Sequence, residues 1–380
     1  MRIGIDYTAA VQQGAGIGRY ARQLVSALVE LDAENKYTLL VGAAGVHDAA
    51  FQVEALTRRA NVRGVLLPVS DHTLSILWHR LHLPLWVELA CGPLDLFYSP
   101  DFTLPPVLRA RTILTIHDLS FIRVPESAEP SLRAYLLQAV PTSVRRADVV
   151  LADSECTRAD LIELLGADPD RVEVVYAGVG QHFQRVSDGG LLRAVRMRYN
   201  LPERFILGVG TLQPRKNFQR LVKAYAMARG HIHSEIKLVI AGASGWMYEG
   251  IFRSVEELGL RDAVCFPGYV ADDDLPALYS MADLFVFPSL YEGFGMPPLE
   301  AMACGTPVVA SNVSSLPEVV GDAALMVDPL DVAALADAMG RLLTDPDLRE
   351  NMVRRGVEQA RRFTWTRAAA NLVDIYRRVA

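Results

Sequence analysis

Short apolar runs rich in β-branched residues recur along the chain and alternate with stretches of helical periodicity. In the first half these runs are RIGIDY, YTLLVG, VRGVLLPV, LDLFYS, TILTIHD, DVVLADS and RVEVVYAG. Helical patterns separate them over residues 17–31, 48–60, 128–146 and 156–166. Strands that alternate with helices in this way predict a parallel sheet covered by helices on both faces.

The alternation lapses in the polar and glycine-rich stretch GQHFQRVSDGG, residues 180–190, and then resumes with RFILGVG, IKLVIAG, AVCFPGY, LFVFPS, PVVAS and ALMV. We therefore predict two doubly wound α/β domains, residues 1–185 and 186–364, and a closing helix over about 365–380. A chain of 380 residues is also longer than one ordinary core requires. Because open α/β sheets bind ligands at the carboxyl ends of their strands, the expected site is a cleft that the two domains face.

Composition narrows the class of protein. The chain is 51% hydrophobic with a net charge of −6, neither half is strongly basic, and no apolar run is long enough to cross a bilayer. We expect a globular protein that binds no nucleic acid. The start, MRIGIDY, leads directly into a strand pattern, which makes the cytoplasm the expected compartment. The four cysteines stand singly, without the spacing of a metal site or redox motif.

The first loop, in GAGIGRYARQL, places Gly14, Gly16 and Gly18 between a strand and a helix, where backbone N–H groups can receive an anion. The spacing differs from that of dinucleotide-binding folds, and the second strand ends without a carboxylate. A nicotinamide cofactor is therefore a minor alternative. A flexible loop that begins a helix explains each glycine equally well.

Arg215 and Lys216, in GVGTLQPRKNF, stand directly before a helix that is predicted to begin near Asn217. The helix dipole disfavours cations at this position, and a bound diphosphate would resolve the conflict. The alternative is a pair of solvated surface cations.

Two glutamates, Glu292 and Glu300, flank the GFG turn in PSLYEGFGMPPLEAM, between a strand and the start of a helix. An ionised carboxylate accepts hydrogen bonds from two adjacent sugar hydroxyls, and Gly293 and Gly295 would let the backbone approach a ligand closely. Alternatively, Glu300 complements the helix dipole and Glu292 caps the loop.

His117 and Asp118 end a strand in TIHDLSF, where a histidine can bond a sugar hydroxyl or steady a developing charge. A satisfied structural histidine is the alternative. The acidic run at residues 272–274 precedes a helical pattern, so we interpret it as helix capping and not as a metal site.

The stretch HTLSILWHRLHLPLWVELA, residues 72–90, mixes aromatic, basic and aliphatic side chains and is compatible with a membrane surface. We prefer a core-facing helix that is interrupted at Pro84, because the basic content of the stretch is low.

Taken together, these motifs resemble the retaining glycosyltransferases of the GT-B fold in family four, which include bacterial mannosyltransferases of polysaccharide assembly. The resemblance covers nearly the whole chain. Its strongest part is the E-x7-E motif in SLYEGFGMPPLEAMACGTPVVAS, supported by GTLQPRKN, TIHDLSF and GIGRY. It implies that Glu300 binds the ribose of a nucleotide sugar and that Glu292 lies beside the donor sugar, with the backbone of Gly293, Phe294 and Gly295.

The same resemblance implies that Arg215 and Lys216 hold the diphosphate. Gly16 would approach the donor phosphates or the acceptor, His117 would touch the transferred sugar, and Val270 would lie near the base. The closing helix would pack back on the first domain.

The function implied is metal-independent, retaining transfer of a hexose from a nucleotide sugar, with GDP-mannose favoured, to a saccharide or lipid-linked saccharide. No cofactor is expected, and a lipid-linked acceptor would bring peripheral contact with the inner face of the membrane. One alternative is a UDP-sugar-dependent glucosyl or N-acetylhexosaminyl transferase. Others are a nucleotide-sugar epimerase or hydrolase on the same fold and a sugar- or nucleotide-binding protein without catalysis.

Overall fold

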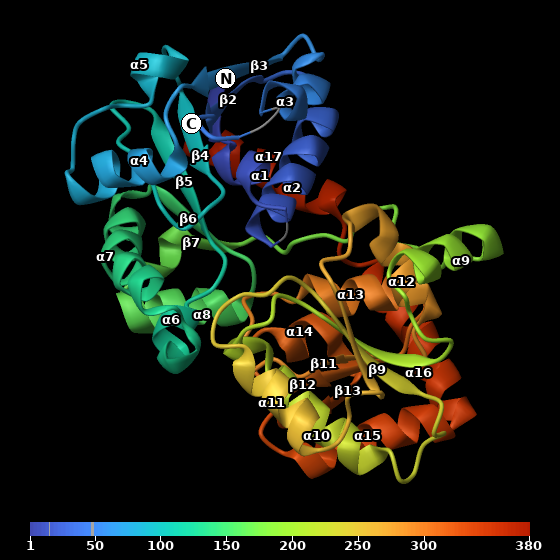
Figure 1. The fold of residues 1–380 in the computed structure, drawn as a ribbon. Coiled ribbons are helices and arrows are strands. Elements are labelled where there is room, and N and C mark those ends of the chain that lie inside the picture. The colour runs from blue at the N-terminus through green and yellow to red at the C-terminus, as the bar shows by residue number, and fades with distance from the viewer. Residues whose placement is uncertain (15, 47–48) are drawn as a thin grey trace. The chain divides into compact units, whose positions relative to one another are not determined.

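The computed structural model describes residues 1–14, 16–46 and 49–380, which form two compact units, each built on one parallel sheet (Figure 1). The N-terminal unit comprises Met1–Leu119, Ser131–Gly178 and Trp365–Ala380. The C-terminal unit comprises Ser120–Pro130 and Val179–Thr364. The two-sheet α/β architecture expected from the sequence is confirmed.

The sheet of the N-terminal unit has seven parallel strands in the order β3-β2-β1-β4-β5-β6-β7. The strands are β1 Arg2–Asp6, β2 Lys36–Gly42, β3 Val62–Leu67, β4 Leu96–Ser99, β5 Arg111–Ile116, β6 Val149–Ala152 and β7 Val172–Val174. All four residues of β4 and of β6 are buried, because helices cover both faces of the sheet. The order reverses between β1 and β4, as in doubly wound folds.

Ten helices belong to this unit within the described residues. They are α1 Thr8–Gln12, α2 Ile17–Leu31, α3 Ala49–Thr57, α4 Asp71–Ser75, the π-helix Ile76–Arg80, α5 Glu88–Cys91, α7 Pro130–Arg146, α8 Glu155–Leu165, the 3₁₀ helix Pro169–Arg171 and α17 Trp365–Val379. The closing helix α17 packs on α2, where the rings of Tyr20 and Trp365 meet edge to face with centroids 5.4 Å apart.

The stretch 72–90 differs from the core-facing helix expected there. Helical structure ends at Arg80, four residues before Pro84, and residues 81–85 are all exposed. Leu74 and Trp78 are buried before this exposed segment and Val87 is buried after it, so both ends of the stretch are anchored inward. The expectation failed because the helical periodicity of the apolar residues continues past the point at which the backbone leaves the helix.

The sheet of the C-terminal unit has six parallel strands in the order β10-β9-β8-β11-β12-β13. They are β8 Phe205–Val209, β9 Lys237–Ala241, β10 Val264–Gly268, β11 Leu284–Phe287, β12 Val308–Ser311 and β13 Leu325–Val327. Every apolar run that the sequence nominated as a strand, in both units, forms one.

The helices of the C-terminal unit are α6 Ser120–Arg123, α9 Gly189–Arg198, α10 Phe218–Ala228, α11 Glu249–Glu257, α12 Leu275–Met281, α13 Met296–Ala303, α14 Leu316–Val320, α15 Val332–Thr344 and α16 Pro346–Ala360. Short 3₁₀ helices lie at Pro125–Ser127, Pro214–Lys216, Asp272–Asp274 and Gly321–Ala323. One buried cluster joins α10 and α15 to the sheet. Segment 120–130 is fixed to this unit by the indole of Trp246, whose Nε1 donates to the Ser127 carbonyl at 2.8 Å.

The acidic run before α12 ends in Asp274, whose side chain bonds outside α12. Asp274 is buried and makes no capping hydrogen bond. Its carboxylate instead accepts Arg198 Nη1 at 2.6 Å and the Tyr199 hydroxyl at 2.7 Å, both from the end of α9. The capping interpretation is therefore wrong for Asp274, because a partner distant in sequence competes with the local backbone.

No helix among the described residues combines the length and the apolar content that spanning a bilayer requires.

Candidate functional site

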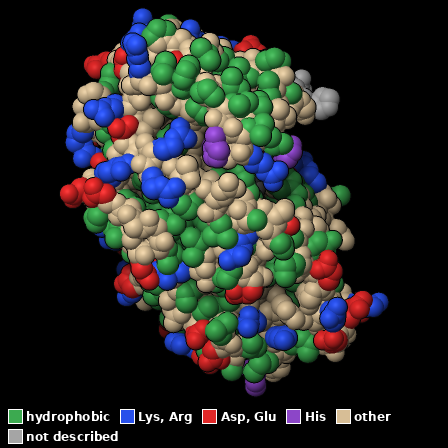
Figure 2. Space-filling view, turned by 90° about the vertical axis from the view of Figure 1, so that its left-hand side faces the viewer, with side chains coloured by type: hydrophobic (Ala, Val, Ile, Leu, Met, Phe, Trp, Pro, Cys, Tyr) green, Lys and Arg blue, Asp and Glu red, His purple; other side chains and the backbone are tan. Residues whose placement is uncertain are grey.

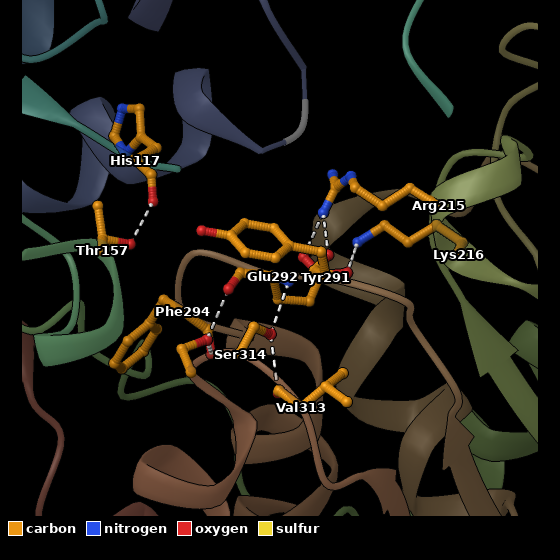
Figure 3. A network of polar contacts seen from close by, with 10 residues as sticks. His117, Thr157, Arg215, Lys216, Tyr291, Glu292, Phe294, Val313 and Ser314 are labelled. Atoms are coloured by element: carbon orange, nitrogen blue, oxygen red, sulfur yellow. Dashed lines mark hydrogen bonds and ion pairs between the residues drawn. The ribbon is translucent and has the colours of Figure 1, made fainter. Parts of the chain in front are cut away.

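Arg215, Lys216 and Glu292 form one ion cluster in the C-terminal unit (Figure 3). Arg215 Nη1 lies 2.8 Å from Glu292 Oε2, and Lys216 Nζ lies 2.6 Å from Oε1. Arg215 Nη1 also donates to the carbonyl of Tyr291 at 2.8 Å. Each carboxylate oxygen of Glu292 thus has its own cation.

The electrostatics of this cluster keep Glu292 ionised. Its side chain is only 9% exposed, and burial by itself raises the pKa of a carboxyl group. The charges of Arg215 and Lys216 outweigh burial and lower the pKa of Glu292 to about 2. Glu292 can therefore accept hydrogen bonds or stabilise positive charge near neutral pH, but it cannot act there as a proton donor.

The two cations are held in place by the turn that follows β8. They occupy the 3₁₀ helix Pro214–Lys216, and Asn217 then adopts a left-handed conformation (φ 58°) before α10 begins. The buried amide of Asn217 donates to the carbonyls of Pro288 and Pro329 at 2.9 and 2.8 Å. This amide ties the β8 turn to the loop after β11, which carries Glu292.

The cluster changes the electrostatic argument for a diphosphate. The sequence suggested that an anionic ligand offsets the cations before α10, and in the structure Glu292 supplies that negative charge. Diphosphate binding by Arg215 and Lys216 stays a prediction, in which the ligand phosphates would share these cations with Glu292.

The loop from Glu292 to Gly295 is held through its backbone. Glu292 N–H donates to Ser314 Oγ at 2.9 Å, and Ser315 Oγ lies 3.0 and 2.8 Å from the carbonyl oxygens of Glu292 and Phe294, which share its single hydroxyl proton. Gly295 has φ +106°, and a Cβ built there would lie 2.7 Å from Leu316 Cδ2. Position 295 therefore requires glycine for both conformation and space.

Glu300 lies one turn into α13 and is buried. Its Oε2 accepts the hydroxyl of Tyr279, from α12, at 3.0 Å. Glu292 lies on the loop between β11 and α13, and Glu300 lies in α13 itself. Glu292 is paired with Arg215 and Lys216. A role for Glu300 in ribose binding stays a prediction.

Phe294 and Val270 are placed by packing, and both are buried. The Phe294 ring meets Phe363 edge to face, with centroids 5.6 Å apart. Val270 follows β10, directly before Ala271, whose N–H donates to the Tyr199 hydroxyl at 3.1 Å. Their assignments to donor contacts, like that of Gly293, rest on the resemblance alone.

His117 lies at the end of β5 in the N-terminal unit, and both of its ring nitrogens have partners. Nδ1 lies 2.7 Å from Asp153 Oδ2, and Nε2 lies 2.9 Å from the Pro100 carbonyl. Burial lowers the pKa of a histidine, but the Asp153 carboxylate outweighs it and raises the pKa of His117 to about 9. The ring is therefore a cation at neutral pH, and sugar contact through Nε2 would require the bond to Pro100 to break.

Asp153 is the site residue that the sequence reasoning missed. Parallel pairing sets Ile116 of β5 beside Ala152 of β6, so the next residues, His117 and Asp153, emerge together. Both strand runs were visible in the sequence, but their adjacency in the sheet was not. The signal was the pair of polar residues directly after two neighbouring strands.

Gly16 and Gly18, at the start of α2, are glycines for different reasons. Gly16 has φ +58°, and a Cβ there would meet open space, so this glycine is required for conformation and leaves its surroundings unfilled. A Cβ on Gly18 would lie 2.1 Å from the Gln13 carbonyl oxygen, so Gly18 permits close packing of α1 and α2. An anion contact at Gly16 stays a prediction. Ala15 lies outside the described residues.

Two family models match the chain. Residues 14–181 match "Glycosyltransferase Family 4", and residues 196–359 match "Glycosyl transferases group 1". The chain is 35% identical over 368 residues to O-antigen chain mannosyltransferase B of Escherichia coli, an alignment that covers 95% of this chain and 96% of that protein. It is 33% identical over 274 residues to the serotype-specific mannosyltransferase WbdA of the same species, covering 71% of this chain and 34% of WbdA.

Solved structures match over the whole chain at low identity. A sucrose-phosphate synthase from Thermosynechococcus elongatus superposes with a TM-score of 0.77 at 23% identity, covering 100% of this chain and 98% of that one. HepE of Anabaena, solved with UDP and glucose, also gives a TM-score of 0.77, at 20% identity and 99% coverage of both chains. At these identities the likeness concerns the fold, and it confirms the expected GT-B fold.

Proposed function

The chain belongs to the group 1 glycosyltransferases of family 4, and we propose that it transfers mannose from GDP-mannose to a saccharide or lipid-linked saccharide acceptor. Glycosyl transfer follows from the family. The choice of mannose is supported by the 35% identity, over nearly the full length of both chains, to an O-antigen mannosyltransferase. A second mannosyltransferase, WbdA, matches over 71% of this chain.

The observation that carries the proposal is the buried ion cluster of Arg215, Lys216 and Glu292. Transfer from a nucleotide sugar releases a nucleoside diphosphate, and negative charge grows on the leaving oxygen in the transition state. Two cations fixed by the β8 turn stabilise that charge without reorganisation, which is the largest contribution in many enzymes. Both cations are side chains of the protein, so neither has to bind from solvent.

Glu292 complements this role on the sugar side. The anomeric carbon becomes positively charged as the leaving group departs, and a carboxylate that stays ionised stabilises such a centre. The same carboxylate accepts hydrogen bonds from sugar hydroxyls. A neutral glutamine of the same shape would keep the packing and lose the charge, so charge and shape can be separated by experiment.

We further propose that the reaction is metal-independent and retains the anomeric configuration. Two fixed cations give the leaving diphosphate the countercharge that a divalent ion supplies in other enzymes. Retention is taken from the family resemblance. Glu300, buried beside Tyr279, is assigned to the ribose, and Val270 to the neighbourhood of the base.

The experiment that tests the function is a transfer assay with a donor panel of GDP-mannose, UDP-glucose and UDP-N-acetylglucosamine. Purified protein is incubated with each donor and a mannose-terminated oligosaccharide, with and without EDTA. Mass spectrometry then follows the product. We expect a mass increase of one hexose with GDP-mannose only, undiminished by EDTA, and an NMR signal of the α-anomer.

The alternatives give different products in the same assay. Transfer from a UDP-sugar would overturn the choice of donor and leave the family activity in place. Donor consumption that is independent of acceptor would favour a hydrolase or an epimerase. Binding without turnover of any donor would favour a binding protein.

A further inference from the structure

His117 and Asp153 form a charged pair inside the N-terminal unit. On the face that Figure 2 shows, Lys, Arg, Asp and Glu side chains are spread over the surface, open to water. The side chains of His117 and Asp153 are instead only 11% and 6% exposed. Burying charges costs free energy even when they are paired. An enclosed pair at the carboxyl edge of a parallel sheet, where ligands of open α/β folds bind, therefore needs a functional explanation.

The hydrogen bonds of the His117 ring determine its protonation. Nδ1 lies 2.7 Å from Asp153 Oδ2, and Nε2 lies 2.9 Å from the Pro100 carbonyl oxygen. An ionised carboxylate and a backbone carbonyl only accept hydrogen bonds, whereas a neutral imidazole donates from one nitrogen alone. Both ring nitrogens must therefore carry a hydrogen, and the ring is a cation whose charge Asp153 balances. The raised pKa of His117 agrees with this protonation.

Packing fixes the position of the ring as well as its charge. Tyr20, from α2, and Phe102, from the loop after β4, meet the ring edge to face, with centroids 4.7 and 5.5 Å away. The Thr157 hydroxyl, from α8, donates to the His117 carbonyl at 3.3 Å (Figure 3). Contacts from three elements thus hold the ring in the orientation in which both of its N–H groups are directed at acceptors.

The carboxylate of Asp153 makes one hydrogen bond, and it is the bond to His117. The other oxygen, Oδ1, is buried without a hydrogen-bond partner among the described residues, and so is the hydroxyl of Tyr20. Buried carboxylates that serve the fold usually have partners for both oxygens, because an unsatisfied buried acceptor is destabilising. Asp153 is therefore explained by its effect on the ring better than by a structural role.

The other titratable groups around the pair do not replace Asp153. Asp101, from the loop after β4, acts on His117 through its charge alone, and burial raises the pKa of Asp101 to about 6. Burial raises the pKa of Tyr20 well above its ordinary value, so its hydroxyl is neutral. Asp118, the residue next to His117, acts on Asp153. Only Asp153 gives the ring a hydrogen-bonded countercharge among the described residues.

We propose that Asp153 is a positioning residue of the transfer reaction, which holds the His117 ring as a cation at the carboxyl edge of the sheet. Asp153 acts through His117 and does not itself meet the substrate. A ligand oxygen that replaces the Pro100 carbonyl as the acceptor of Nε2–H receives a charge-assisted hydrogen bond, which is stronger than a neutral one. A cation fixed in advance also stabilises developing negative charge without reorganisation. The inference rests on the proposed function.

Asp153→Asn separates the charge of the ring from its position. Asparagine keeps the shape and can donate to Nδ1, so the ring can stay in place as a neutral imidazole. The pKa of His117 should then fall from about 9 toward the ordinary 6.5. At pH 8 we expect kcat/KM to fall about thirtyfold, the ratio of the protonated fractions at these two pKa values. At pH 6 the ring is mostly protonated in both proteins, and kcat/KM should agree within about twofold.

The comparison of the two pH values excludes a structural defect. A loss of kcat/KM by the same factor at pH 6 and at pH 8 would contradict the proposal. Asp101 titrates near pH 6 in both proteins, so its effect cancels in their ratio. Asp170→Asn, at an exposed carboxylate of the same unit, is the matched control and should behave like wild type at both pH values.

His117→Gln tests whether Asp153 acts through the ring. Glutamine can donate to the Pro100 carbonyl but carries no charge, so this variant should be weakly active at both pH values. Adding Asp153→Asn to His117→Gln should cause no further loss, because residues that act as one unit are not additive. Losses that add would show that Asp153 acts independently of His117, and would overturn the proposal.

NMR titration of protein labelled at histidine measures the charge of the ring without any substrate. The His117 signal, identified by its absence from His117→Gln, should titrate near pH 9 in wild type and near 6.5 in Asp153→Asn. Titration at the same pH in both would overturn the proposal. Transfer by wild type without the pH-dependent loss in Asp153→Asn would remove this inference alone. Titration as expected without transfer from any donor would remove the proposed function, and with it the role of Asp153 in transfer.

Discussion

Lys216 Nζ lies 2.6 Å from Glu292 Oε1, although the two residues are 76 positions apart in the chain. They meet because β8 and β11 are neighbours in the sheet, so the turns that follow these strands emerge side by side. Arg215 completes the cluster at the other oxygen of the same carboxylate. The proposed glycosyl transfer depends on these three charges.

Glu292→Gln removes the negative charge and preserves the shape of the side chain. We expect turnover to fall by about a hundredfold or more, the usual effect of losing one group that stabilises a transition state. Nucleotide binding should stay within a few-fold of wild type, since both cations remain. Steady-state kinetics and nucleotide titration measure the two effects. Asp273→Asn, at an exposed carboxylate in the same unit, is the control and should change neither.

Glu300→Gln tests the ribose assignment. Because the ribose is common to nucleotide and donor, we expect affinity for GDP and for GDP-mannose to fall together, by about tenfold to a hundredfold for a hydrogen bond to a charged group. Gln keeps an acceptor for the Tyr279 hydroxyl, so the fold should survive. Loss of GDP-mannose affinity with normal GDP affinity would contradict the assignment. Glu257→Gln, on the exposed end of α11, is the control.

The pair of His117 and Asp153 predicts a pH dependence of stability. Asp153 raises the pKa of His117 to about 9 in the folded protein, from 6.5 for an ordinary histidine. The stabilisation is therefore fully present below pH 6.5 while Asp153 is ionised, and it is lost as the pH rises through 9. We expect the difference in melting temperature between wild type and Asp153→Asn to be largest below pH 6.5 and to shrink toward pH 9.

Scanning calorimetry across this range measures the difference directly. His231→Asn, at an exposed histidine, should show a constant difference from wild type over the same range. A difference between wild type and Asp153→Asn that does not vary with pH would mean that the pair is not an ion pair.

Gly295→Ala should destabilise the C-terminal unit. The new Cβ meets Leu316 at 2.7 Å in a backbone conformation with φ +106°, and such strain costs on the order of 1–3 kcal/mol. Gly340→Ala is the matched comparison, because this glycine lies inside α15 and a Cβ there would meet open space. It should stabilise by up to about 1 kcal/mol. Urea unfolding of both variants gives the free energies, and equal effects would contradict the strain argument.

The sequence predicted the fold well because parallel strands that are buried on both faces appear in the sequence as continuous apolar runs. RIGIDY and LFVFPS are examples, and they form β1 and β11. The prediction failed where the local pattern does not determine the residue at which a helix ends. The apolar periodicity of residues 72–90 does not reveal that the helix ends at Arg80 and that Leu81–Leu85 lie in water.

The sequence identified the residues of the candidate site but not the contacts between them. Arg215, Lys216 and Glu292 were each selected, but their pairing depends on strand order, which the sequence does not give directly. The same limit hid Asp153, which meets His117 because β5 and β6 are adjacent. Asp274 was assigned to a cap for a related reason, since its partners Arg198 and Tyr199 come from α9, distant in the chain.

The measurement that tests the central claim most directly is isothermal titration of wild type, Lys216→Ala and Lys223→Ala with GDP and GDP-mannose. Lys216 belongs to the buried cluster, whereas Lys223 is an exposed lysine of α10. We predict saturable binding to wild type and to Lys223→Ala, and binding at least about tenfold weaker to Lys216→Ala, since a charge-assisted hydrogen bond to phosphate is lost. Equal affinity of correctly folded Lys216→Ala and wild type would contradict the assignment of the diphosphate to this cluster.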